Sequence, residues 1–517
     1  MKVTSKNFDA IVIGSGFGGT MTALKLIEAG MRVLMIERGD WVSRGPHNWG
    51  SRASVDLTPH YDRSTPLYIR RGGDKPVMGL YACVGGPSVF YGAVSFRFRE
   101  ADFHPPHSIA GPAAAQWPFG YADLEPWYCQ AERLLDVAGD DAADPTAPPR
   151  SCPWPQRPAP LAEVSRRIKD AALELGLHPF PLPLAINYRP DKDRQQPCIS
   201  CTTCDTYACA IQAKNDLATT IIPHLIERGL SLVPNMVVVK IEERNGCVQH
   251  VSAVSKQSGE VHTWSAPRVI LAAGALGSPH ILLASGLPAR NPAGHCVGRY
   301  LMRHVNAIVY GIHRGTADQE GRFHKQLAIM DAYFADPQAP HLDGKIGSLQ
   351  QMPTPPAALV ENAVPGWLGR MLGSQVRRLT GLLAIAEDQP QFDNGIRLAS
   401  GPADTYGLPR IEISHTYSPR DRQAIRQLTR LAARIMRKAG ALATYTHHIR
   451  TFSHAVGTVR MGPDPNQAPL DELCRFRGVE GLYVVDGSFM PTSAAVNPSL
   501  TIAANALRVG HHIARLG

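Results

Sequence analysis

The feature that most constrains the fold is the alternation of strand, turn, helix and strand within residues 8–37. Residues 8–13 (FDAIVI) are short, rich in β-branched side chains and almost uncharged, which is typical of a buried parallel strand. Residues 20–29 have a helical pattern, and residues 32–36 (RVLMI) repeat the strand pattern. This order predicts a βαβ unit, and therefore an α/β fold with a parallel sheet.

The turn inside this unit carries a glycine motif that suits a dinucleotide. Gly14 permits a tight turn, Gly16 lets a pyrophosphate approach the backbone, and Gly19 lets the helix pack closely on the strand. The start of the helix offers free N–H groups to phosphates. Glu37 ends the second strand, where its carboxylate can accept both ribose hydroxyls and disfavours a 2′-phosphate. The motif predicts dinucleotide binding, without separating FAD from NAD.

Length and composition exclude several classes of protein. A chain of 517 residues exceeds a single hydrophobic core, so we expect two domains. The formal charge of +9 is dispersed along the chain, which argues against nucleic acid as a partner. No apolar run is long enough to span a membrane, and the first one, residues 10–13, is too short for a signal peptide. We therefore expect a cytoplasmic protein with mostly reduced cysteines.

Three further segments narrow the assignment. They are a second glycine turn at residues 85–92 (GGPSVFYG), a buried strand and turn at 268–279 (RVILAAGALGSP), and a C-terminal stretch at 453–510 that contains HAVGTVRMGPDP. With these motifs in this order, the chain resembles the glucose–methanol–choline (GMC) oxidoreductases over its whole length. This resemblance implies an FAD-dependent enzyme that oxidises an alcohol to a carbonyl.

The resemblance also implies the domain organisation. A discontinuous, Rossmann-like FAD-binding domain is expected at residues 1–104, 213–304 and 447–517. A sheet-based substrate-binding domain is expected at residues 105–212 and 305–446. The first part of the substrate domain is rich in proline and looks irregular, whereas 407–416 alternates like a strand and 418–438 has helical periodicity.

Within the family, residues 117–128 and 212–214 look most like the sugar-oxidising branch, such as pyranose oxidases and FAD glucose dehydrogenases. We therefore predict oxidation of a sugar, glycoside or cyclitol, with oxygen or another acceptor taking the electrons. Two alternatives stay open: a non-sugar alcohol, aromatic or sterol, as substrate, or electron transfer through FAD and an iron–sulfur cluster.

The catalytic residues implied by the resemblance are His454 and Asn497. A neutral histidine is a suitable base for an alcohol because its ordinary pKa is about 6.5. Asn497 would orient the substrate oxygen, although Asn497-Pro498 is also typical of an N-cap followed by the first residue of a helix. The expected helix at 498–509 would direct its positive end toward the flavin ring.

The flavin contacts are carried over motif by motif. For Val238, in the expected strand at 235–241, an ordinary core role is nearly as plausible. Two positions depart from other family members: Phe90 replaces a histidine that some members bond covalently to the flavin, so noncovalent FAD is expected, and Tyr91 replaces a common asparagine. The expected contacts are Gly14, Gly16, Gly19, Glu37, Gly86, Ser88, Val238 and Asp486.

Two segments have no single interpretation from sequence. Cys198, Cys201, Cys204 and Cys209 form a dense cluster. Structural thiols or local disulfides are favoured over an iron–sulfur cluster, whose spacing only partly matches, and over zinc, so no metal site is predicted. Residues 364–383 mix large apolar side chains with arginines. They are typical of a helix that packs on its own domain or covers an entrance, and less often of an interfacial membrane helix.

Overall fold

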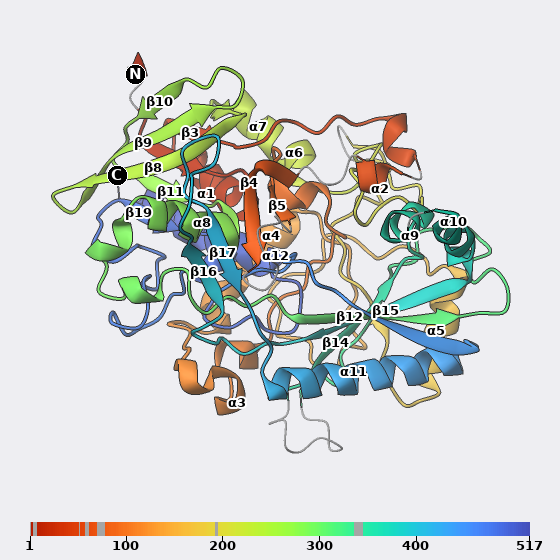
Figure 1. Cartoon of the computed structure of the whole chain (residues 1–517). Coiled ribbons are helices and arrows are strands. Elements are labelled where there is room, and N and C mark those ends of the chain that lie inside the picture. Colours follow the sequence, from red (N-terminus) through yellow and green to blue (C-terminus); the bar gives the residue numbers. More distant parts are fainter. Residues whose placement is uncertain are drawn as a thin grey trace.

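The computed structural model describes residues 2–3, 8–50, 52–56, 61–69, 78–191, 195–334, 345–364 and 366–516. Four sheets organise these residues (Figure 1). A parallel five-stranded sheet has the order β19-β11-β2-β3-β7, with β2 Ala10–Ile13, β3 Val33–Ile36, β7 Ser231–Val233, β11 Val269–Leu271 and β19 Leu482–Val484.

The second large sheet is antiparallel. Its order is β18-β12-β15-β14-β13-β6, with β6 Phe180–Pro181, β12 Val305–Ile312, β13 Leu327–Ile329, β14 Gly347–Met352, β15 Leu379–Ala386 and β18 Ala443–His448. One smaller sheet contains β1 Lys2–Val3, β8 Met236–Arg244, β9 Cys247–Ser255 and β10 Val261–Trp264. Another contains β4 Tyr61–Ile69, β5 Met78–Tyr81, β16 Gly395–Leu398 and β17 Ile411–Ser414.

The described α-helices cover these sheets and connect them. They are α1 Phe17–Glu28, α2 Ala53–Asp56, α3 His107–Ala110, α4 Tyr121–Leu134, α5 Glu163–Leu173, α6 Leu217–Thr220, α7 Ile222–Glu227, α8 Gly274–Ala284, α9 Ala357–Ala363, α10 Trp367–Ser374, α11 Pro419–Lys438 and α12 Ser499–Ala514. Among the described residues, no helix is both long and apolar enough to cross a membrane.

The parallel sheet brings three loops together at one edge. β2 pairs with β3 on one side and with β11 on the other, and β11 pairs with β19. The chain order therefore reverses between β2 and β11, and the carboxyl ends of β2, β11 and β19 meet there. Ligands of open α/β sheets bind at such a switch point.

One face of the antiparallel sheet is covered by a helix, and the other face is available to the candidate active site. The apolar stripe of α11, which includes Ile425, Leu428 and Ile435, packs with Leu349 of β14 in one buried cluster. α11 runs along the lower side of this sheet (Figure 1). Because side chains alternate along a strand, Ser348 and Gln350 of β14 point to the opposite face from Leu349.

The strands fall in several of the expected domain segments. The five parallel strands come from residues 1–104, 213–304 and 447–517. β18, however, runs across the expected boundary at residue 446, and β4 pairs with β17 although the two were expected in different domains. The region expected to be irregular, 105–212, contains the fourteen-residue helix α4. The domain boundaries themselves stay a prediction.

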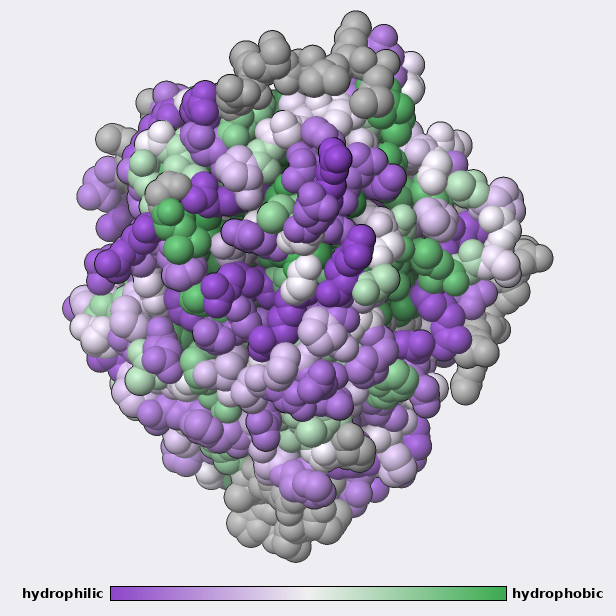
Figure 2. Space-filling view, turned by 90° about the vertical axis from the view of Figure 1, so that its left-hand side faces the viewer, coloured by the Kyte–Doolittle hydropathy of each residue, from purple (hydrophilic) through white to green (hydrophobic). Residues whose placement is uncertain are grey.

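Hydrophobic side chains are mostly enclosed. The face in Figure 2 is largely hydrophilic, with hydrophobic residues in small separate groups. The largest buried cluster joins the parallel sheet, α1 and α12, and α12 packs directly against both α1 and α4. The C-terminal helix is thereby fixed against the first βαβ unit.

Candidate active site

The turn after β2 consists of glycines for two different reasons. A Cβ on Gly14, whose φ is +99°, would lie 2.4 Å from the carbonyl oxygen of Ala272. A Cβ on Gly19 would lie 2.0 Å from the carbonyl oxygen of Gly14. Packing therefore requires these two glycines, whereas a Cβ on Gly16 would meet no atom within 4 Å. Gly16 leaves open backbone at the start of α1, where a phosphate can approach.

Ser15 links this turn to two other predicted contacts. Its N–H and hydroxyl donate to one carboxylate oxygen of Glu37, at 2.9 and 2.6 Å, and the N–H of Gly39 donates to the other at 2.9 Å. The Ser15 hydroxyl also accepts from the N–H of Gly85 at 2.9 Å. Burial raises the pKa of Glu37, and the bonds from Ser15 oppose this shift. The backbone of Arg38 also hydrogen-bonds this carboxylate, so Glu37 is held firmly at the end of β3.

The second glycine turn lies against the first. A Cβ on Gly86, whose φ is +55°, would lie 3.3 Å from the Cα of Gly16. The buried hydroxyl of Ser88 donates to the carbonyl of Gly85 at 2.7 Å and accepts from the N–H of Leu217 at 3.1 Å. Ser88 therefore braces the turn from within, and Gly86 presents its backbone beside Gly16.

The side chains of Asp486 and Val238 are occupied within the protein. One oxygen of Asp486 accepts from the N–H of Gly274 at 3.0 Å and from the hydroxyl of Ser278, and the other accepts twice from Ser488. Burial raises the pKa of Asp486, while these bonds lower it. Asp486 thus ties together the loops after β11 and β19, and Val238 of β8 is a buried core residue.

These residues fit FAD. The open backbone of Gly16 lies beside the Gly86 turn, and Ser15 joins these turns to Glu37 at the carboxyl edge of the parallel sheet. The shape of these turns depends on the close packing of Gly14 and Gly19 and on the hydrogen bonds of Ser88 and Asp486. Ser15 was not among the expected contacts, although a hydroxyl between two motif glycines was visible in the sequence.

His454 lies between two polar side chains. Its Nε2 is 3.3 Å from Nδ2 of Asn497, and its Nδ1 is 3.0 Å from Nδ1 of His304. Burial lowers the pKa of His454 well below its ordinary value, and the nearby Lys325 lowers it further, while Asp388 raises it. His454 is therefore neutral at neutral pH, as a base must be.

Asn497 is not the N-cap of the last helix. α12 begins at Ser499, its N-cap is Pro498, and no side-chain hydrogen bond caps it. The amide of Asn497 instead faces His454 through Nδ2 and accepts at Oδ1 from Nε2 of Gln350, at 2.8 Å. The cap interpretation is wrong because the side chain of Asn497 hydrogen-bonds to Gln350 of β14 and not to the backbone of α12.

The loop before Asn497 is held from below. Ala494, which has a positive φ of 55°, donates its N–H to Glu387 at 2.9 Å. The N–H of Ala495 donates to the hydroxyl of Tyr333 at 3.2 Å, and its carbonyl accepts from Ser348 at 2.7 Å. Ser348 lies in β14, Glu387 follows β15 and Tyr333 follows β13, so the antiparallel sheet fixes the approach to Asn497.

A buried ion triad supports this loop. Nζ of Lys345 lies 2.5 Å from Asp102 and 2.5 Å from Glu387, and the side chains of all three residues are at most 3% exposed. Burial alone would lower the pKa of Lys345, but the two carboxylates raise it above its ordinary value. Sequence reasoning missed this triad because its members are far apart in the chain.

Tyr91 forms hydrogen bonds that hold neighbouring backbone segments together. Its hydroxyl donates to the carbonyl of Asn215 at 2.8 Å. The buried Nζ of Lys214 donates to the carbonyls of Tyr91, Cys204 and Tyr207, at 3.0, 3.0 and 2.7 Å. Lys214 thereby ties the second glycine turn, residues 85–92, to the cysteine cluster.

The four clustered cysteines are free thiols. The cluster has no internal disulfide, so the expectation of local disulfides is wrong in that part. Within the described chain, no three of these sulfurs lie within 4.8 Å of one another, which is too open for a single zinc ion. Burial raises the pKa of Cys198 to about 11.

One disulfide was not expected. Cys129 of α4 is bonded to Cys152, and eight other cysteines are free. The sulfurs lie beside Arg97, which is paired with Glu132 at 2.8 Å. Nothing in the spacing of these two cysteines distinguishes them in the sequence.

Residues 364–383 form two kinds of element. The helix α10 ends at Ser374, and β15 begins at Leu379 and lies in the middle of the antiparallel sheet. A single helix over the segment is therefore wrong. α10 does present exposed apolar side chains: Trp367 is 71% exposed and Met371 is 47% exposed.

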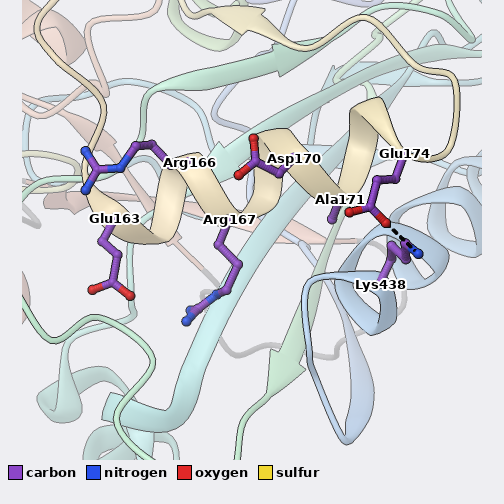
Figure 3. Close-up of a pocket in the computed structure, with 7 residues that line it drawn as sticks. All are labelled: Glu163, Arg166, Arg167, Asp170, Ala171, Glu174 and Lys438. Atoms are coloured by element: carbon purple, nitrogen blue, oxygen red, sulfur yellow. Dashed lines mark ion pairs between the residues drawn. The ribbon is translucent and has the colours of Figure 1, made fainter.

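A separate pocket lies beside α5, away from the predicted site residues. It has a volume of about 400 Å³ and is bounded by α5 and the end of α11. Figure 3 shows charged side chains along α5, with Lys438 paired to Glu174 at 2.6 Å. None of the predicted site residues lines it, and we assign it no role.

Known proteins resemble this chain over most of its length. Models of the N- and C-terminal parts of the GMC oxidoreductases match residues 8–306 and 390–506. The chain is 32% identical to 6'''-hydroxyparomomycin C oxidase of Streptomyces lividus, over 98% of this chain and 91% of that protein. It is 31% identical to paromamine 6'-oxidase of Streptomyces fradiae, with the same coverage.

More distant proteins share the fold. Fructose dehydrogenase large subunit of Gluconobacter japonicus is 27% identical over 98% of this chain and 97% of its own. The structure of pyridoxine 4-oxidase from Mesorbium loti superposes with a TM-score of 0.67 at 18% identity, covering 98% of this chain and 99% of that one. Aspergillus oryzae formate oxidase gives a TM-score of 0.70 at 15% identity, with 99% of each chain covered.

Proposed function

The chain belongs to the GMC oxidoreductase family and is an FAD-dependent enzyme that oxidises alcohols, and from this premise we propose that it acts on a hydroxyl of a sugar, glycoside or cyclitol. The observation that carries the proposal is the direct contact between His454 and Asn497 just before α12. A neutral imidazole and a carboxamide side by side are what alcohol oxidation requires of a protein.

The substrate class rests on the relatives and on polar side chains nearby. Two relatives above 30% identity are named for paromomycin- or paromamine-type substrates. In this chain Lys325 pairs with Asp205 at 2.6 Å beside Gly92, and Gln350 contacts Asn497. We infer an amino sugar or a related glycoside as substrate, since such side chains hydrogen-bond hydroxyl and amino groups.

The proton step follows from the geometry of His454. Its Nε2 accepts the proton of the substrate hydroxyl as the O–H bond breaks. Asn497, held by Gln350, donates from Nδ2 toward the same place and stabilises the negative charge that develops on the oxygen. The Gly14–Gly19 turn, Glu37 and Gly86 would hold FAD, which would supply the acceptor for the hydride of the carbinol carbon.

Three further features belong to the proposal. FAD is held noncovalently, because the phenyl ring of Phe90 offers no nucleophile to the flavin. The electrons pass to oxygen or to another acceptor. The enzyme works in the cytoplasm, which eight free cysteines support and the Cys129–Cys152 disulfide opposes.

The test is an anaerobic screen that follows bleaching of the flavin absorbance. Paromamine, D-glucosamine and D-glucose are compared with 2-methyl-1,2-propanediol and benzyl alcohol. We expect rapid bleaching by an amino sugar. Bleaching by the diol or the aryl alcohol alone would assign a non-sugar substrate, and no bleaching by any alcohol would refute the proposed reaction.

A further inference from the structure

A single backbone carbonyl determines where the protons lie around His454. Nε2 of His304 is 3.0 Å from the carbonyl oxygen of Ser493. A carbonyl oxygen only accepts hydrogen bonds, so Nε2 of His304 must carry a hydrogen. A neutral imidazole carries one N–H, and Nδ1 of His304 is therefore an acceptor.

The same reasoning continues through His454. Its Nδ1 lies 3.0 Å from Nδ1 of His304 and must donate to it. Nε2 of His454 then has a free lone pair and faces the amide nitrogen of Asn497, which donates. A cationic His304 would reverse this order and place an N–H of His454 against the NH₂ of Asn497, so the neutral arrangement is favoured.

His304 is firmly held in this orientation. Its side chain is fully buried, and its backbone has a positive φ of 61°. Its N–H donates to Asp388 at 3.1 Å, and its carbonyl accepts from Tyr417 at 2.8 Å. Asp388 also accepts from the hydroxyl of Ser493 at 2.9 Å, so one carboxylate fixes both ends of the contact between His304 and Ser493.

We propose that His304 is a positioning residue that selects the Nδ1–H tautomer of His454 and so keeps Nε2 free to take the substrate proton. Without an acceptor at this place, the Nε2–H tautomer competes, and that form has no lone pair facing the substrate. The hydrogen bond made by one ring nitrogen of a histidine decides which nitrogen carries the hydrogen.

The test reads the tautomer directly. In the FAD-loaded protein labelled with ¹⁵N-histidine, signals of His454 are assigned with His454→Gln. We expect the wild type to carry the hydrogen on Nδ1 and His304→Phe to shift a large share to Nε2. Flavin reduction should slow by roughly 10- to 100-fold, less than the full contribution of a general base, about 10²- to 10⁴-fold.

Two variants control this experiment. His304→Asn restores an acceptor. It should recover part of the Nδ1–H tautomer of His454 and part of the rate of flavin reduction. His313→Phe removes another buried histidine, bonded to Thr380 at 2.9 Å, and should change neither tautomer nor rate. A wild-type His454 that carries its hydrogen on Nε2, or an unchanged tautomer in His304→Phe, would overturn the proposal.

A second observation concerns Gln350. Its Nε2 donates to Oδ1 of Asn497, so its Oε1 points elsewhere, and among the described residues this buried oxygen has no hydrogen-bond partner. An unpaired buried acceptor costs about 1–3 kcal/mol. We infer that Gln350 Oε1 accepts from a second hydroxyl or amino group of the substrate, an inference that rests on the proposed function.

The test compares D-glucosamine and paromamine with their monodeoxy analogues in the wild type and in Gln350→Met. With one of the monodeoxy analogues, the wild type should reduce its flavin roughly tenfold more slowly than with the parent sugar. Gln350→Met slows every substrate by disturbing Asn497 and should lose that discrimination. Discrimination that persists, or is absent from the wild type, overturns this inference; failure of every alcohol overturns the proposed function instead.

Discussion

Replacing Lys345 by methionine removes the cation between two buried carboxylates. Asp102 and Glu387 each lie 2.5 Å from Nζ, and neither side chain is exposed to water. Methionine preserves most of the side-chain volume, so the change isolates the loss of charge. Glu387 also holds the N–H of Ala494, and the loop before Asn497 should loosen with it.

The magnitude follows from the burial of the triad. Removing one partner of a buried ion pair costs about 3–5 kcal/mol, because a charge is left without compensation. Lys438→Met makes the same change of charge at an exposed pair, where Lys438 and Glu174 are 46% and 60% exposed and 2.6 Å apart. Such a pair contributes about 0–1 kcal/mol.

The assay is reversible chemical denaturation of the FAD-loaded proteins, followed by far-UV circular dichroism. Lys345→Met should lose about 3–5 kcal/mol of unfolding free energy and Lys438→Met at most about 1 kcal/mol. Flavin reduction should also slow in Lys345→Met at temperatures where it is folded, and stay unchanged in Lys438→Met. Equal destabilisation by the two variants would refute the reasoning.

Three further predictions concern the cofactor and the base. Because burial and the nearby Lys325 lower the pKa of His454 well below its ordinary value of about 6.5, the rate of flavin reduction should stay level as the pH falls through 6.5 and drop only at clearly lower pH. Stopped-flow reduction across pH checks this, and a half-maximal rate near pH 6.5 contradicts it. Gly16→Val should fold but bind less FAD, whereas Gly19→Val should fold poorly, as measured by circular dichroism and by the ratio of flavin to protein absorbance; equal FAD content in Gly16→Val and wild type would argue against the cradle. Acid precipitation should release all the flavin into the supernatant, and a yellow pellet would rule out noncovalent binding.

The local parts of the fold could be predicted because their signals are local. β2, α1 and β3 follow from a short apolar strand, three glycines and a helical period, and α11 follows from its apolar stripe. The segment at 364–383 misled us because hydrophobicity is similar in an amphipathic helix and in a buried central strand.

The site could be predicted only where a motif marks it. His454 and Asn497 stand in recognisable segments, and the structure places them in contact. His304, Gln350 and Lys345 have no such mark, because their roles depend on how β14, β15 and the loop before α12 meet in space. Asn497 looked like an N-cap because sequence shows the neighbour along the chain and not the neighbour across it.

The central claim is that His454 takes a proton from an alcohol bound beside FAD. Anaerobic stopped-flow mixing of His454→Ala with the best substrate of the screen tests it most directly. The account predicts a variant that keeps its yellow FAD and reduces it about 10²- to 10⁴-fold more slowly than the wild type. Reduction of the variant flavin at the wild-type rate would contradict it.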